Sequence, residues 1–293
     1  MNNLLKFSLI TCLLACFSFG DADAQERPNI IYILTDDLGY GDVKVYNKEG
    51  KINTPNIDKL AKQGMRFTDA HSPSGVCTPT RYSIMTGRYP WRSQRPVGVL
   101  NGFSRPLMEN DRATVASLLK ENGYNTAVVG KWHLGLGWVP KREYAHLLAN
   151  KRYGIDAEMN PDHIDLTAPM TVSPNTNGFD YSYVLPASLD MQPYGYVENG
   201  KLVDPLTSFT TGKKPDTGYA GAFWRPGLMS PSFDFFDVLP GFTRKANEFL
   251  KRQTRKNLSF CTSLCPHPTP HGCPSQDLSE VQEQESMVIL CSK

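Results

Sequence analysis

The feature that most constrains the fold is the alternation of apolar runs with helix-like segments through the first half of the chain. The run NIIYILTDD at 29–37 places five apolar, mostly branched residues before two carboxylates, which indicates a buried strand. Strands that alternate with helices predict an α/β fold with a mainly parallel sheet covered on both faces. Further strands are predicted over 65–71, 125–130 and 181–185, and helices over 55–63, 78–87 and 114–123.

Helix boundaries follow from residues that favour helix ends. Thr54 suits the N-cap, Pro55 the first helical position, and Gly64 the stop after 55–63. From about 139 to 231 the pattern is looser and rich in Pro, Gly, Asn and aromatic residues, which predicts long surface excursions. A final amphipathic helix is predicted over 236–253, with a buried stripe of Val238, Phe242, Ala246, Phe249 and Leu250.

The N-terminus has the pattern of a processing signal. Lys6 precedes a short apolar run, and Ala22-Asp23-Ala24 forms an A-x-A cleavage site, so residues 1–24 are predicted to be a signal peptide. The apolar run is too short to span a bilayer comfortably. We therefore expect export to the periplasm or the extracellular space, with no stable membrane span. The alternative is a lipoprotein anchored at Cys16.

Charge and cysteine content exclude some classes of protein. Lys and Arg number 31 against 29 Asp and Glu, with no basic block, so nucleic acid is not an expected partner. Cys77 is the one cysteine between Gln25 and Phe260, which excludes a disulfide framework in that region. A lone cysteine is usually a small buried hydrophobe. Here the neighbouring residues favour another role.

Two segments carry residues suited to chemistry. Asp36 and Asp37 follow the first strand, where open α/β sheets place their sites, and adjacent carboxylates suit calcium or magnesium. Taken alone, such a pair is more often a solvated turn. In Cys77-Thr78-Pro79-Thr80-Arg81, Pro79 begins a helix, so Cys77 lies at its positive end. Arg81 lies one turn further on and can point at the same anion.

Three motifs in order resemble the formylglycine-dependent sulfatases. The C-x-P-x-R core at 77–81 resembles their signal for converting cysteine to formylglycine. The segment GKWHLG at 130–135 resembles the family segment that carries a Lys and a His into the site, and DDLGYGD at 36–42 resembles its first metal-binding turn. A softer match places Ser188 where the family often has a site-lining serine. We interpret His71 and His163 as structural.

The resemblance implies an alkaline-phosphatase-like fold and a sulfatase of the arylsulfatase type, with residues 25–257 as the N-terminal part of its catalytic domain. Its partners would be a sulfate ester and a formylglycine-generating enzyme. The formylglycine from Cys77 would be hydrated to a gem-diol, and one hydroxyl, acidified by Ca²⁺ rather than Mg²⁺, would attack sulfur.

The same resemblance assigns roles to the surrounding residues. Asp36 and Asp37, with residue 77, would bind the metal ion. Lys131 and Arg81 would hold the diol and the charge on sulfate. His133 would assist proton transfer, and Ser188 would contact nucleophile or substrate.

The resemblance stops at about Asn257. The strand, P-H-T-P-like segment, Asp-Asn metal pair and second Lys expected next are not found in residues 258–293, so the fold is expected to be C-terminally truncated. We interpret this tail as a frameshift product, because the shifted frame permits PFFLYFPLPAPHTPWLP. The alternative is a divergent disordered tail. His267 and His271 receive no catalytic role.

Two other functions remain open. The chain could be an inactive truncated fragment that lacks half of its metal ligands, or a related phosphodiesterase or phosphonate hydrolase. The natural substrate is also open between aryl and carbohydrate sulfates.

Overall fold

The computed structural model describes residues 27–36, 38–148, 158–214, 223–253 and 258–264, the last range as backbone only. The chain divides into two compact units, Met1–Pro28 with Ser292–Lys293, and Asn29–Cys291. The architecture below belongs to the second unit. Within the described residues no helix is long and apolar enough to cross a membrane.

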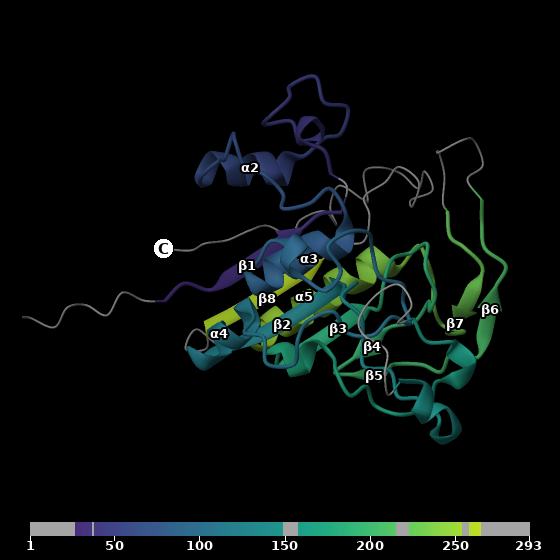
Figure 1. Ribbon diagram of the computed structural model, residues 1–293. Coiled ribbons are helices and arrows are strands. Elements are labelled where there is room, and N and C mark those ends of the chain that lie inside the picture. Colours follow the sequence, from purple (N-terminus) through teal and green to yellow (C-terminus); the bar gives the residue numbers. More distant parts are fainter. Residues whose placement is uncertain (1–26, 37, 149–157, 215–222, 254–257, 265–293) are drawn as a thin grey trace, which may run out of the picture. The chain divides into compact units, whose positions relative to one another are not determined.

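Four α-helices and eight strands make up the described part of this unit (Figure 1). The helices are α2 (Pro55–Gln63), α3 (Cys77–Thr86), α4 (Val115–Glu121) and α5 (Val238–Arg252). The strands are β1 (Ile30–Leu34), β2 (Tyr124–Lys131), β3 (Tyr181–Leu185), β4 (Val197–Glu198), β5 (Lys201–Leu202), β6 (Ser208–Thr210), β7 (Gly227–Met229) and β8 (Leu258–Leu264). Short 3-10 turns lie at Tyr40–Asp42, Pro90–Arg92, Arg142–Leu148, Pro161–His163 and Pro174–Asn177.

The central sheet has the strand order β1-β8-β2-β3-β4-β5. The first four strands in this order are parallel, and β4 and β5 continue the sheet as an antiparallel edge. A separate antiparallel hairpin joins β6 and β7. The prediction of a mainly parallel sheet is confirmed.

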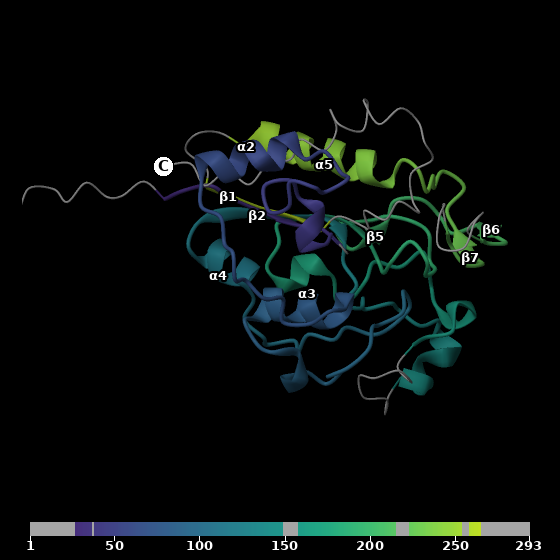
Figure 2. The same ribbon diagram turned by 90° about the horizontal axis from the view of Figure 1, so that it is seen from above.

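Helices cover both faces of the sheet because its strands are apolar on both sides. Alternate residues of a strand point to opposite faces. Val128 belongs to one core cluster with Tyr82 of α3 and Ala116 of α4, whereas Val129 belongs to a second cluster with Phe242 of α5. Figure 2 shows α3 and α4 on one side of the strands and α5 on the other.

The strand β8 comes from the segment interpreted above as an aberrant tail. Its backbone pairs in parallel with β1 on one side and with β2 on the other. Strand β1 joins the sheet through this pairing, so the described sheet extends seven residues past the boundary at 257. Residues 265–293, with His267 and His271, lie outside the described residues, and the frameshift remains a hypothesis.

Most predicted elements are present, but two expectations are wrong. The stretch from 139 to 231 does not simply run over the surface, because Met170, Phe179 and Tyr194 lie buried in the core. The stripe on α5 is confirmed, with four of its members buried and Leu250 partly buried. Residues 65–71 form no strand, and their side chains are exposed, Met65 by 79% and Phe67 by 64%. A strand needs a neighbour for its backbone groups, and none of the described strands lies beside this segment.

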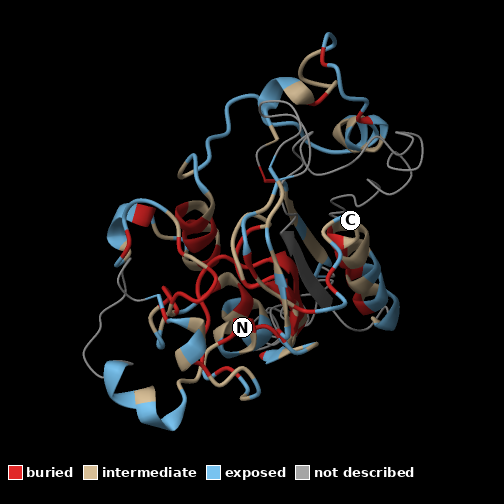
Figure 3. Ribbon diagram, turned by 90° about the vertical axis from the view of Figure 1, so that its right-hand side faces the viewer, coloured by how far each residue is buried: buried red, intermediate tan, exposed pale blue. Residues whose placement is uncertain are grey.

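The burial pattern separates the sheet from the segment around α2. Buried residues concentrate along β2, β3, α3 and the loops at 100–108 and 132–138, whereas α2 buries none of its residues (Figure 3). Polar contacts connect the residues of the segment around α2. Thr54 accepts a hydrogen bond from the Lys44 amide at 3.0 Å, and Asp58 accepts one from the Val45 amide at 2.9 Å.

The close approach of α4 to the loop before β3 depends on Gly178. Its φ is +103°, and a Cβ there would lie 2.3 Å from the backbone nitrogen of Ser117. We expect Gly178→Ala to lower the free energy of unfolding by about 2 kcal/mol or more, from strain plus overpacking. Gly87→Ala is the matched control, because its φ is +65° but no atom lies within 4 Å. Urea unfolding of both variants checks this, and equal losses would contradict it.

Candidate active site

Cys77 is the first residue of α3, at the end of the helix where the backbone dipole is positive. Val76 before it is extended, and Pro79 lies in the first turn, where its missing N–H costs nothing. The helix ends at Gly87, which adopts the left-handed conformation that favours glycine. Cys77 is partly exposed, so its side chain remains accessible at the helix end.

The ends of strands β1 and β2 bring a carboxylate and an ammonium group to this cysteine. Asp36 follows β1 and Lys131 ends β2, and parallel strands place both at the same edge of the sheet. The Lys131 ammonium contacts Asp36 Oδ2 and lies 3.1 Å from Cys77 Sγ. Cys77 Sγ is also 3.7 Å from Asp36 Oδ1. Lys131 and Asp36 are 1% and 7% exposed, so this pair is buried.

Arg81 adds a second buried cation. Its Nη2 lies 3.4 Å from Asp36 Oδ2, and its Nη1 donates to the carbonyl of Lys131 at 2.7 Å. One carboxylate thus faces two positive groups in the described part of the site. The excess positive charge beside Cys77 favours a bound anion, such as a sulfate group.

Thr78 connects the helix end to His133, a link that sequence reasoning missed. Its hydroxyl donates to the His133 carbonyl at 2.8 Å and accepts from the Leu100 amide at 3.1 Å. The His133 amide donates to the Pro186 carbonyl after β3. Thr78 occupies a variable position of the C-x-P-x-R pattern, so the motif gave no indication of this role.

The orientation of His133 fixes which ring nitrogen can accept a proton. Its Nε2 lies 2.6 Å from the Leu100 carbonyl, which can only accept, so Nε2 carries the hydrogen. Nδ1 is therefore the acceptor, and it is buried without a hydrogen-bond partner among the described residues. The backbone at His133 has φ +56°, uncommon for a residue other than glycine.

Burial lowers the pKa of His133 from 6.5 to about 3, and the positive charges of Lys131 and Arg81 add to the effect. The Leu100 carbonyl and Asp36 act in the opposite direction without reversing it. The imidazole is therefore neutral at physiological pH. A neutral ring with an unpaired Nδ1 can accept a proton from a neighbouring hydroxyl.

This low pKa makes a prediction about acid stability. Between pH 6.5 and 3 the unfolded chain binds a proton on His133 that the folded chain does not, so stability falls as the pH falls. The slope from this residue is at most about 1.4 kcal/mol per pH unit. We expect His133→Asn, which tolerates positive φ, to unfold with a shallower pH dependence. Urea titrations at several pH values check this, and parallel slopes would contradict it.

The described residues supply only part of a calcium site. Asp36 contributes a carboxylate beside Cys77, and carboxylate oxygens are ligands that Ca²⁺ prefers. Calcium, however, takes about six to eight oxygen ligands. No cluster of three or more His, Cys, Asp or Glu side chains suited to a metal occurs in the part of the chain that the structure describes. Asp37 lies outside the described residues. With Lys131 and Arg81 already present, a bound cation would need further acidic ligands.

The remaining predicted residues lie in different settings. Ser188 is buried just beyond the end of β3, but its hydroxyl makes no hydrogen bond to Cys77, Asp36 or Lys131 in the described structure. His163 stacks on Tyr144 with ring centroids 3.8 Å apart, as expected for a structural residue. His71 pairs with Asp69 on the exposed surface.

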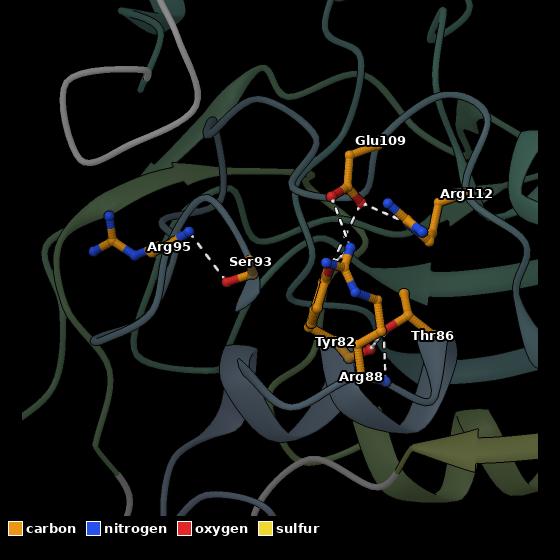
Figure 4. A network of polar contacts seen from close by, with 7 residues as sticks. All are labelled: Tyr82, Thr86, Arg88, Ser93, Arg95, Glu109 and Arg112. Atoms are coloured by element: carbon orange, nitrogen blue, oxygen red, sulfur yellow. Dashed lines mark hydrogen bonds and ion pairs between the residues drawn. The ribbon is translucent and has the colours of Figure 1, made fainter. Parts of the chain in front are cut away.

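A polar network anchors the other end of α3 (Figure 4). Glu109 accepts from Arg88 at 3.3 Å, from Arg112 at 3.3 Å and from the Tyr82 hydroxyl at 3.4 Å. Burial would raise the pKa of Glu109, but hydrogen bonds from its own amide and from Arg112, with the charges of Arg112 and Arg88, lower it. This network holds the helix whose first residue is Cys77.

The parallel α/β sheet and α3 thus bring a cysteine, a lysine, an arginine and a carboxylate together at one edge, in a site suited to an anion. The sulfatase family profile matches residues 28–209, and the chain belongs to the sulfatase family. Its fold is the alkaline-phosphatase-like α/β fold of the sulfatases. This confirms the expected family and fold class.

Known proteins give the extent of this similarity. The chain is 36% identical over 255 residues to an N-acetylgalactosamine-6-O-sulfatase of Bacteroides thetaiotaomicron, covering 77% of this chain and 45% of that protein. It is 46% identical over 125 residues to human arylsulfatase A, covering 43% of this chain and 24% of that protein.

A solved structure from a study of glycosaminoglycan metabolism in Bacteroides thetaiotaomicron superposes with a TM-score of 0.62 and 31% identity, covering 83% of this chain and 53% of that one. The chain thus spans about half the length of these two Bacteroides thetaiotaomicron proteins.

Proposed function

We propose that this chain carries the nucleophile of a sulfate monoester hydrolase and that Cys77 is converted to formylglycine by a formylglycine-generating enzyme. The observation that carries the proposal is the contact of Lys131 with both Cys77 and Asp36 at the positive end of α3. A buried lysine between a carboxylate and residue 77 would hold an oxygen at that residue and orient it. Membership of the sulfatase family supports the reaction type.

Each described side chain has a defined task in this proposal. Lys131 and Arg81 offset the charge that develops on the sulfate oxygens. His133, neutral and with its Nδ1 lone pair unused, accepts the proton released by a hydroxyl at residue 77. Ser188, at the same edge of the sheet, contacts the substrate. When formed and hydrated, the formylglycine supplies the oxygen that attacks sulfur.

Calcium is the metal ion we propose for the site, with magnesium less suited. Asp36 and Asp37 would hold it together with the oxygen at residue 77, and further ligands would come from beyond the described residues. When bound, the ion acidifies a neighbouring hydroxyl and offsets negative charge.

The substrate class we favour is a carbohydrate sulfate. One relative that matches 77% of this chain is an N-acetylgalactosamine-6-O-sulfatase, whereas human arylsulfatase A matches 43%. An aryl sulfate such as 4-nitrophenyl sulfate serves as the generic assay substrate.

Parallel assays on 4-nitrophenyl sulfate and bis(4-nitrophenyl) phosphate test the reaction type. We expect hydrolysis of the sulfate ester and a much lower kcat/KM for the phosphodiester. A preference for the phosphodiester would favour the phosphodiesterase alternative. Turnover of neither ester by protein with residue 77 converted would contradict the proposed activity of this chain.

For domain organisation we propose a signal peptide over 1–24, a catalytic part over 25–257 and an aberrant tail over 258–293, with export to the periplasm or the extracellular space. Resequencing the gene from the codon for Phe249 onward tests the tail. One base gained or lost near Asn257 would restore a longer sulfatase frame. An unchanged sequence would contradict the frameshift.

A further inference from the structure

Arg95 is a buried cation for which the described chain provides no counter-ion. The residue is 8% exposed, and its Nε is buried with no hydrogen-bond partner in the part of the chain that the structure describes. Its one hydrogen bond among the described residues is made by the backbone, where its amide donates to the Ser93 hydroxyl at 3.1 Å. A charged side chain that is mostly removed from water is costly unless it is paired, so a largely buried arginine without a counter-ion among the described residues indicates a missing anion.

The neighbouring arginine of the same segment shows the usual arrangement. Arg88 is paired with Glu109, and the two side chains point toward each other in Figure 4. In the same view Arg95 points away from this network. The acid that serves Arg88 and Arg112 therefore does not serve Arg95.

The backbone around Arg95 is shaped to hold its guanidinium. Gly98 adopts φ +73°, and a Cβ at that position would lie 3.3 Å from Arg95 Nη2 and 3.9 Å from its Cζ. The turn thus passes close over the planar group, where only a glycine leaves room without strain. A guanidinium fixed in this way presents its fork in one orientation, which suits a carboxylate or a sulfate.

The segment that carries Arg95 leads directly to the candidate active site. Leu100, five residues on, donates to Thr78 beside Cys77 and accepts from His133. Five residues of extended chain span at most about 18 Å, and the turn at Gly98 shortens this path. Gly98, whose turn passes beside Arg95 Nη2, stands only two residues before Leu100, so the guanidinium lies beside the segment that contacts Thr78 and His133.

We propose that Arg95 binds a second anionic group of the substrate, a carboxylate or another sulfate, next to the sulfate ester held at Cys77. This inference rests on the proposed sulfatase function and narrows it to polyanionic sulfated glycans. Arg95 is then a specificity-determining residue that contacts the neighbouring unit of the substrate and leaves the reacting sulfate to Lys131 and Arg81.

Titration calorimetry on the Cys77→Ala protein, which binds without turnover, tests the inference. The probes are the disaccharide of chondroitin 6-sulfate and the same disaccharide with its carboxylate reduced to an alcohol. We expect the acidic form to bind about tenfold more tightly, as for a hydrogen-bonded charge pair. Adding Arg95→Gln should remove this preference, whereas Arg95→Lys, which keeps the charge but not the fork, should retain part of it.

Thermal unfolding separates this role from a structural one. Removing an unpaired buried charge should leave the Tm of Arg95→Gln unchanged or higher, whereas Arg88→Gln, which breaks a pair, should lower it. A lowered Tm in Arg95→Gln with the carboxylate preference intact would overturn the inference. Equal binding of the two probes by the protein that retains Arg95, or binding of neither, would overturn it too. If the proposed function itself fails, the protein that retains Cys77 will not hydrolyse 4-nitrophenyl sulfate.

Discussion

Replacing Cys77 with alanine is expected to lower kcat/KM for 4-nitrophenyl sulfate by about 10⁴-fold or more, as for loss of a catalytic nucleophile. The proposal gives residue 77 the attacking oxygen and assigns other roles to the remaining side chains of the site. Lys131 and Arg81 bind charge, and His133 transfers protons. The measurement is steady-state kinetics on a preparation that hydrolyses this ester before the substitution.

Cys77→Ser separates the proposed nucleophile from a merely structural cysteine. Serine supplies an oxygen but lacks the second hydroxyl of a hydrated aldehyde, so a sulfate ester formed on it has no internal route of release. We expect this variant to lose turnover and to accumulate covalent sulfate on the Phe67–Arg81 peptide, seen by mass spectrometry. Thr86→Ala, at the other end of α3, is the control and should stay active. A fully active Cys77→Ala protein would contradict the mechanism.

Replacing Lys131 with methionine is expected to cost about 3 kcal/mol of unfolding free energy, because it leaves the buried carboxylate of Asp36 with one cation fewer. The ammonium is 1% exposed and the carboxylate 7%, so water cannot take over the lost contact. Urea unfolding measures the change. Adding Asp36→Asn in the same protein should recover part of the loss, because the uncompensated charge is then gone.

The surface pair of Lys120 and Asp180 provides a matched control. Its ion pair spans 2.7 Å, but the two side chains are 50% and 39% exposed. Lys120→Met should therefore cost less than about 1 kcal/mol. Similar losses of unfolding free energy in Lys120→Met and Lys131→Met would contradict the claim that burial strengthens the effect of breaking the Lys131–Asp36 pair.

Local sequence signals predicted the elements that carry the site. The N-cap and proline signals placed α2 and α3 within a residue of their observed starts, and the apolar runs located β1, β2 and β3. The position of Asp36 at the carboxyl edge of the sheet was predictable from topology. The approach of Lys131 to Asp36, Cys77 and Arg81 was expected from the resemblance of their motifs to the sulfatases. Periodicity and topology were sufficient for the helices and strands, whereas the site needed the motifs.

Other features depend on contacts between distant segments. Residues 65–71 have strand-like composition but no neighbouring strand, so their apolar side chains remain exposed. The orientation of His133 is set by the Leu100 carbonyl, a backbone group with no sequence signature. The close approach of Gly98 to the Arg95 guanidinium needs a positive φ, and a single sequence does not distinguish this glycine from an ordinary loop glycine.

The central claim is that Cys77 is the precursor of the nucleophile. The most direct measurement is mass spectrometry of the tryptic peptide Phe67–Arg81 from protein produced together with a formylglycine-generating enzyme. We predict a peptide in which an aldehyde replaces the thiol and is captured by a hydrazide reagent. Recovery of the peptide entirely as an alkylated thiol, while a known sulfatase from the same cells is converted, would contradict the account.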